Sequence, residues 1–153
     1  MDNIITNLII TLVLTLVVVV PVLIVSKNHS KKRKQKLRDL FDKLAQENNL
    51  NIADPDIFAM KIIGLDPSKH TLLFIDYQAQ DPITLVVDIE KAGKCNVNQT
   101  TYNGMTSEVK LVFENRASNT ILLYKQYKDK ESHLKLITEK AEMWKKKLNS
   151  QLL

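Results

Sequence analysis

The sequence predicts an α+β protein with an N-terminal transmembrane helix and a bent antiparallel sheet of about six to seven strands, capped by a C-terminal amphipathic helix. Three observations predict it. Residues 3–26 contain no charged side chain. Residues 57–124 favour strands, with apolar and polar residues alternating in several segments. After residue 127 the apolar period becomes helical. We therefore divide the chain into an anchor (1–26), a basic juxtamembrane segment and helix (27–52), and an antiparallel β domain with a C-terminal helix (53–153).

The apolar run from Ile4 to Val25 is long enough for a membrane span. A hydrocarbon core of about 30 Å needs roughly 20 helical residues, and this run supplies them. A cleaved signal peptide would need basic residues before a short apolar region and a small-residue cleavage site. The start Met1-Asp2-Asn3 and the end Ile24 to Lys27 offer neither. The sequence therefore predicts a retained anchor.

A basic cluster follows the apolar run, and no basic residue precedes it. Its members are Lys27, Lys31, Lys32, Arg33, Lys34, Lys36 and Arg38. Because the basic side of a span stays in the cytoplasm, we expect a single-pass protein of the inner (cell) membrane with its N-terminus outside and its C-terminal domain cytoplasmic. The cluster is also expected to attract anionic headgroups nonspecifically, at about 1 kcal/mol per residue close to the surface.

The overall charge of +5 is local to this cluster. It holds seven of the 22 basic residues, so 15 remain after residue 38 against 16 acidic ones, for a net charge of −1. A nucleic-acid partner is not expected, because such a protein spreads its basic patch over the fold. Cys95 is the only cysteine, which agrees with a reducing compartment. We interpret it as a small buried hydrophobe rather than a nucleophile.

Residues 31–49 indicate an amphipathic helix. Its apolar positions, spaced by three and four, are Leu37, Leu40, Phe41, Leu44 and Ala45. The helix either continues the membrane span or is interrupted at residues 28–30. Asn48-Asn49 and the sequence before Pro55 end it, since a proline disfavours helix in the residue before it. Asp54 and Asp56, on either side of Pro55, indicate a solvated acidic turn, with an acid–base pair as the alternative.

Six segments favour strands: 60–65, 71–75, 83–87, 93–101, 108–114 and 120–124. Two of the turns between them have a physical basis. Asp66 and Pro67 suit the first two positions of a type I turn. Asn103-Gly104 supplies the two positive-φ residues of a type I′ hairpin turn.

The C-terminal segment has one apolar stripe at helical spacing, which we interpret as the structural plug of the core. Its residues are Leu134, Ile137, Ala141, Trp144 and Leu148. Asp129 or Ser132 is expected to cap the start of this helix.

Sequential antiparallel strands followed by one amphipathic helix with a central tryptophan resemble the pleckstrin-homology-like fold, including its GRAM and bacterial variants. The passage Ile83 to Val97 is similar to that family's strand, polar kink and strand. More narrowly, the stretches 63–66, 72–74 and 88–95, together with Trp144, resemble a group of small uncharacterised single-span bacterial membrane proteins. The resemblance implies a helix that plugs one end of a bent, nearly closed sheet. A seventh strand would have to come from residues 77–82 or from the long second strand.

Phosphoinositide-binding members of that fold carry several basic residues around their first hairpin. Here that hairpin offers Lys61, Lys69 and His70 alone, so headgroup recognition is not carried over.

No motif for catalysis or cofactor binding is found. The three histidines, at 29, 70 and 133, lack the spacing of metal ligands, and no phosphate loop or nucleophile elbow is present. We expect no enzyme activity, no metal and no cofactor. The expected function is that of a membrane-tethered cytoplasmic binding or scaffold module that recognises a protein partner or self-associates. The alternative is a small accessory subunit of a larger membrane complex, associating through its transmembrane helix.

Overall fold

The structure is a computed structural model that describes residues 15, 17, 19, 31–78, 81–115, 120–126 and 128–152. The chain divides into two compact units, Met1–Lys36 and Leu37–Leu153. The predicted anchor, apart from three positions, and Lys27 lie outside the described residues. Within the described ranges, no helix is both long and apolar enough to cross a membrane.

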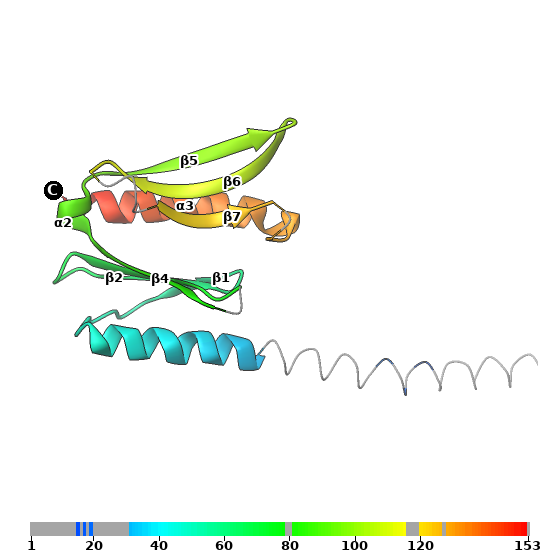
Figure 1. Ribbon diagram of the computed structural model, residues 1–153, viewed down its shortest axis with the longest axis horizontal. Coiled ribbons are helices and arrows are strands. Elements are labelled where there is room, and N and C mark those ends of the chain that lie inside the picture. Colours follow the sequence, from blue (N-terminus) through cyan, green and yellow to red (C-terminus); the bar gives the residue numbers. More distant parts are fainter. Residues whose placement is uncertain are drawn as a thin grey trace, which may run out of the picture. The chain divides into compact units, whose positions relative to one another are not determined.

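The second unit contains two antiparallel sheets and a C-terminal helix (Figure 1). The first sheet has the order β1 (Asp56–Phe58), β2 (Lys61–Asp66), β3 (Thr71–Asp76) and β4 (Ile83–Asp88). The second has the order β5 (Cys95–Tyr102), β6 (Met105–Phe113) and β7 (Thr120–Lys125). The predicted α+β class, with antiparallel strands before a C-terminal helix, is confirmed. The expectation of one bent sheet is replaced by two sheets of four and three strands.

The two sheets separate at α2 (Ile89–Ala92), a single helical turn within the passage expected to be a polar kink. Asp88 ends β4 and caps this turn by accepting a hydrogen bond from the backbone N–H of Lys91 at 3.2 Å. Gly93 follows with φ of 75°, a conformation that favours glycine. The chain therefore leaves one sheet and enters the other within six residues, between Asp88 and Cys95.

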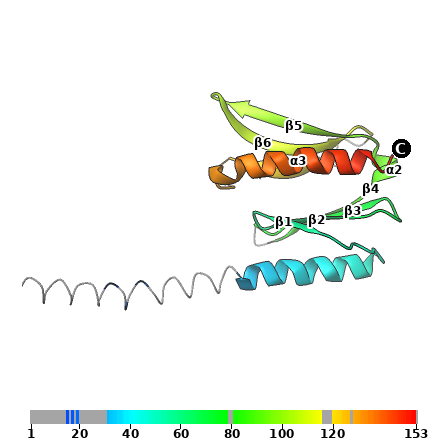
Figure 2. The same ribbon diagram turned by 180° about the vertical axis from the view of Figure 1, so that it is seen from behind.

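A helix covers one face of the first sheet, and the main core covers the other. Residues 31–47 are helical, and Leu37, Phe41 and Ala45 form one apolar cluster with Ile62, Leu73 and Ile75 on β2 and β3. The opposite face packs into the main core with α3 (Leu134–Asn149) and the second sheet. Figures 1 and 2 show α3 alongside the second sheet, at the level of β7.

Gly64 allows the first helix to lie close to its sheet. A Cβ atom at this position would be 2.6 Å from both Phe41 Cζ and Ile52 Cγ2. Contacts that short do not occur between carbon atoms, so a side chain at position 64 would push these neighbours away.

The apolar stripe of α3 lies in the main core. Ile137, Ala141, Trp144 and Leu148 are buried, and Leu134 is partly buried against the same cluster. Asn149 fixes the end of the helix to β5: its Oδ1 accepts from the Cys95 N–H at 2.8 Å, and its Nδ2 donates to the Cys95 carbonyl at 2.9 Å.

Asp56 corrects one sequence interpretation. It begins β1, a short strand that the sequence did not indicate, and pairs opposite Ile63. Its carboxylate accepts from Lys140 Nζ at 2.7 Å and from Trp144 Nε1 at 3.2 Å. The interpretation of Asp56 as part of a solvated turn was therefore wrong, because a polar group that close to a buried indole serves to satisfy its N–H.

Both turns predicted from the sequence, at Asp66-Pro67 and at Asn103-Gly104, form where expected. Residues 67–70 connect β2 to β3. Asn103 and Gly104, with φ of 49° and 76°, connect β5 to β6. The prediction that Asp129 or Ser132 caps the C-terminal helix is wrong. The helix α3 follows the short helix η1 (Glu131–His133), so its N-cap residue is His133, and no side chain caps it. Asp129 has a different partner, as the next section describes.

Candidate functional site: a pocket beside a buried lysine

The basic residues predicted to face the membrane surface lie on the helix of residues 31–47, as far as they are described. Lys31, Lys32, Arg33, Lys34, Lys36 and Arg38 are all exposed. Their neighbour Leu37 is fully buried, because it belongs to the stripe that packs on the sheet. Lys31 to Lys34 span a full helical turn, so the exposed basic side chains surround the start of the helix, and the buried stripe begins at Leu37.

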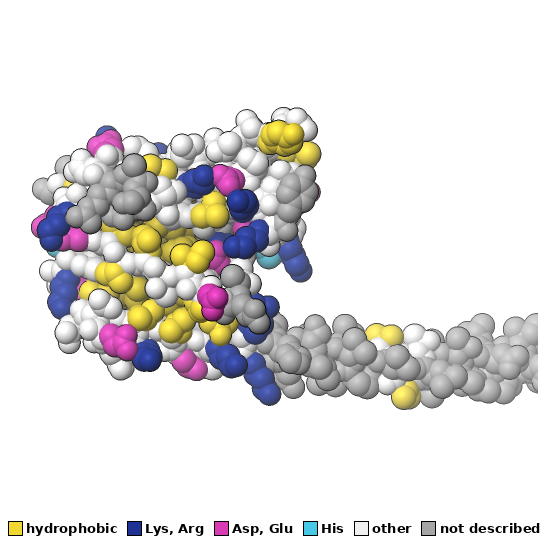
Figure 3. Space-filling model, in the orientation of Figure 1, with side chains coloured by type: hydrophobic (Ala, Val, Ile, Leu, Met, Phe, Trp, Pro, Cys, Tyr) yellow, Lys and Arg dark blue, Asp and Glu magenta, His cyan; other side chains and the backbone are white. Residues whose placement is uncertain are grey.

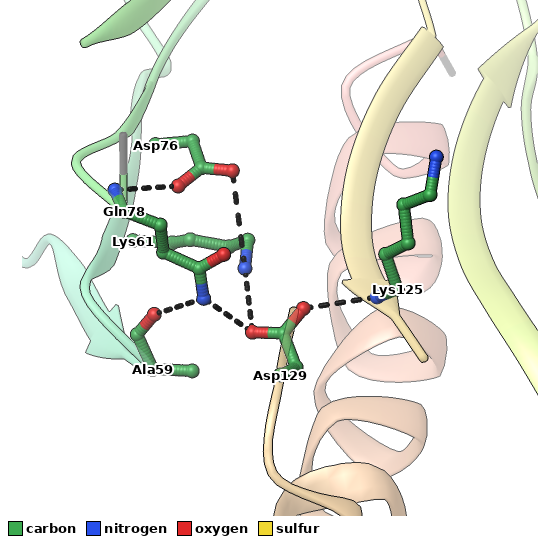
Figure 4. Close-up of polar contacts among 6 residues, drawn as sticks. All are labelled: Ala59, Lys61, Asp76, Gln78, Lys125 and Asp129. Atoms are coloured by element: carbon green, nitrogen blue, oxygen red, sulfur yellow. Dashed lines mark hydrogen bonds and ion pairs between the residues drawn. The ribbon is translucent and has the colours of Figure 1, made fainter. Parts of the chain in front are cut away.

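One lysine, Lys61, lies inside the folded unit at a position that the sequence analysis did not single out. Lys61 opens β2 and is 1 % exposed. Its Nζ donates to Asp129 Oδ1 at 2.9 Å and lies 3.9 Å from Asp76 Oδ2. Figure 4 shows Lys61 and Gln78 directed from the first sheet towards Asp129, which follows β7 of the second. This cluster therefore links the two sheets.

Each oxygen of the Asp129 carboxylate is used. Gln78 Nε2 also donates to Oδ1, and to the Ala59 carbonyl at 3.0 Å. The other oxygen, Oδ2, accepts from the backbone N–H of Lys125 at 2.9 Å. A buried ion pair is tolerated only when its remaining lone pairs and protons are satisfied in this way. Asp129 therefore holds the chain between β7 and η1 against the first sheet.

The buried cluster carries a net negative charge. Lys61 supplies one positive charge, whereas Asp76 and Asp129 supply two negative ones, and the exposed fractions of the three side chains are 1 %, 6 % and 1 %. Gln78 adds no charge, and its buried Oε1 has no hydrogen-bond partner among the described residues. An excess of buried negative charge favours a cation nearby.

A pocket of about 270 Å³ opens beside Asp129, between the start of β6, the end of β7 and η1. Met105 and Leu134 provide its apolar lining, and Thr106 and Gln126 provide uncharged polar groups. The remaining lining residues are Tyr124, Asp129 and Glu131. Two carboxylates and a phenol thus share one small cavity with an apolar wall.

Tyr124 is only 2 % exposed, yet it lines this pocket. Burial raises the pKa of its phenol above the ordinary value, and the carboxylates of Glu131 and Asp129 raise it further. The hydroxyl group therefore stays protonated and lies close enough to both carboxylates to sense their charge. It makes no hydrogen bond to any residue that the structure describes.

The other chemistry-bearing groups do not assemble into a site. Across the part of the chain that the structure describes, no three His, Cys, Asp or Glu side chains are placed to hold a metal ion. Cys95 is fully buried, and burial raises the pKa of its thiol to about 12. His70 Nδ1 lies 3.5 Å from Glu90 at the surface.

The sequence does not indicate the pocket because its residues come from two separate segments, 105–106 and 124–134. In the sequence Lys61 is only one of the few basic residues near the first hairpin, whereas the structure buries it. One signal was present: a lysine at the start of an otherwise apolar strand implies a buried counter-charge. The position of that counter-charge, 68 residues later in the chain, is not encoded locally.

Comparisons of this chain with protein-family models, curated proteins and solved structures found no match.

Proposed function

We propose that this chain is a membrane-tethered binding module. Residues 1–26 anchor it in the inner (cell) membrane, and the unit Leu37–Leu153 lies in the cytoplasm, where it recognises a protein partner or self-associates. The observation that carries the proposal is an uncharged apolar run followed by a basic cluster, whose described residues are exposed, at the start of the folded unit. That order is typical of a span with its basic side in the cytoplasm.

We also propose that the folded unit is a pleckstrin-homology-like domain. Sheets of four and three strands with a C-terminal helix against their inner faces support this assignment. So does the burial of Trp144, which fills the core at the position expected of a plugging helix. Folds of this kind host many unrelated functions, so the fold alone does not identify the partner.

Two features support binding through the folded unit. The pocket beside Asp129 is concave and combines an apolar wall with convergent polar groups, as recognition sites do. The hairpin of β5 and β6 also presents two large apolar side chains at its tip, Tyr102 and Met105, which are 66 % and 51 % exposed. Figure 3 shows this apolar group at the end of the hairpin. Exposed aromatic and methionine side chains are enriched in protein interfaces.

The test is affinity purification of the full-length chain from gently solubilised membranes, beside a variant whose residues 1–26 are replaced by an unrelated span. A partner retained by both forms supports recognition by the folded unit. A partner lost on replacement of the span would overturn it in favour of the alternative, an accessory subunit of a larger membrane complex that associates through its transmembrane helix. Analytical ultracentrifugation of both forms measures self-association. Self-association that both forms retain supports the folded unit, and self-association lost on replacement of the span supports the alternative.

A further inference from the structure

The pocket beside Asp129 has a charge balance, a size and a set of hydrogen-bond acceptors that together specify a class of ligand. We infer that it binds an alkylammonium or guanidinium group, presented as a lysine or arginine side chain of the partner protein. This inference names the chemistry of the partner in the proposed function and rests on it.

Charge is the first argument. The buried set of Lys61, Asp76 and Asp129 leaves one negative charge uncompensated, and Glu131 adds another at the pocket wall. Lys125, the nearest lysine on β7, is 53 % exposed and lies 3.5 Å from Glu108. Lys128 and Lys130 in the following loop are exposed to solvent, where salt screens their charges. A cation in the pocket would therefore meet a net negative field.

The polar wall supplies the second argument. A protonated amine donates up to three hydrogen bonds and accepts none, so it needs acceptors on several sides. Glu131, Tyr124 and Gln126 line the pocket, and each carries a side-chain oxygen that can accept a hydrogen bond. Asp129 already uses both its oxygens for Lys61, Gln78 and Lys125, so it contributes charge rather than a free acceptor.

Size and the apolar wall supply the third argument. Pockets for drug-sized ligands and cofactors start at about 300 Å³, and this one is slightly smaller, at about 270 Å³. A single long side chain fits such a space. The aliphatic stem of a lysine or arginine buries well along apolar surface, which Met105 and Leu134 provide.

The test uses the full chain in lipid nanodiscs with ¹³C-labelled methionine methyl groups. Met105 lies in the pocket wall, whereas Met143, 46 % exposed on α3, does not line it and serves as the internal reference. The probe is Nα-acetyl-lysine methylamide, and the uncharged control is Nα-acetyl-norleucine methylamide. We expect a saturable shift of the Met105 signal with the lysine probe alone. No saturable shift, or an equal shift with the norleucine control, would overturn the inference.

Two substitutions sharpen this experiment. Glu131→Gln removes one pocket charge at an exposed position and is expected to weaken binding about fivefold, whereas the matched Glu139→Gln, exposed further along α3, leaves it unchanged. Tyr124→Phe keeps the ring, removes the hydroxyl oxygen and is expected to weaken binding about threefold. If the Glu131→Gln variant binds the lysine probe as tightly as the unsubstituted chain, the charge argument is contradicted. This outcome holds even if the Tyr124→Phe variant folds poorly.

A second probe, n-butylammonium, distinguishes the two sources of the cation. Binding of the capped lysine supports a side chain of a partner as the source of the cation. If n-butylammonium binds and the capped lysine does not, the source is instead a free small amine. The failure of this inference is distinguishable from the failure of the proposed function. A chain that captures a partner by affinity purification but shows no Met105 shift refutes only the pocket assignment.

Discussion

The Asp66 carboxylate is buried and accepts several hydrogen bonds, so its ionised form stabilises the fold. Asp66 ends β2, is 1 % exposed and accepts hydrogen bonds from the Asn51 N–H at 2.6 Å and the Ser68 hydroxyl at 2.6 Å. The backbone N–H groups of Ser68 and Lys69 donate to it at 2.9 and 3.2 Å. These bonds, led by that of the Ser68 hydroxyl, lower the pKa of Asp66 from 3.8 to about 2 although burial opposes them.

The pKa difference sets the expected magnitude. Since one pKa unit corresponds to about 1.4 kcal/mol, the ionised Asp66 stabilises the fold by about 2.5 kcal/mol. The folded-state value lies below the unfolded one, so this stability is present above pH 4 and is lost as the pH falls from about 4 to about 2. Asp66→Asn cannot ionise, so it should lower the free energy of unfolding by about 2 kcal/mol at pH 7 and by almost nothing at pH 2.

Urea unfolding of the fragment 31–153, followed by circular dichroism between pH 2 and pH 7, measures this difference. Subtracting the variant from the unsubstituted fragment removes the contribution of every other carboxylate, which titrates equally in both. Asp54→Asn, at an exposed position, is the matched control and should change little at any pH. A difference between the Asp66→Asn variant and the unsubstituted fragment that stays constant from pH 7 to pH 2 would refute the reasoning.

Four further predictions concern the core, the close contact at Gly64, the buried thiol and the topology. Trp144→Ala should lower the free energy of unfolding by about 3–5 kcal/mol through a core cavity, and unchanged thermal melting of the fragment 31–153 would remove its assignment as the plug. Gly64→Ala should cost about 1–3 kcal/mol because the new Cβ meets Phe41, and Phe41→Leu should recover part of that loss; no recovery would place the strain elsewhere. Cys95, with its thiol pKa raised to about 12, should resist iodoacetamide at pH 8 until urea unfolds the chain. Replacing residues 31–34 with acids should scramble the topology, and a reporter after Leu153 that stays cytoplasmic would show that these residues are not the main orienting signal.

Local signals in the sequence predicted the elements that depend on local chemistry. Asn103-Gly104 forms the hairpin turn because both residues tolerate the positive φ that the turn requires. The stripe around Trp144 forms α3 because its spacing puts every large apolar side chain on one face. The bounds of the six strands that the sequence indicated, β2 to β7, agree with the structure to within a few residues.

Features that depend on distant pairing were not predictable. β1 is only three residues long, directly follows Pro55 and exists because it pairs with β2. The division into two sheets depends on α2, a four-residue helix too short to give a periodic signal. Lys61 opens a strand of the first sheet and Asp129 lies in the loop after β7 of the second, so they meet only in the folded tertiary structure. The pocket beside them is a product of that tertiary structure, so neither half of it carries a recognisable motif.

The central claim is that a membrane anchor holds the folded unit on the cytoplasmic side. The most direct measurement combines alkaline washing of membranes with a reporter fused after Leu153 of the otherwise unaltered chain. The account predicts that the protein stays with the washed membranes and that the reporter is active in the cytoplasm. Release of the protein into the wash, or a reporter active only outside, would contradict it.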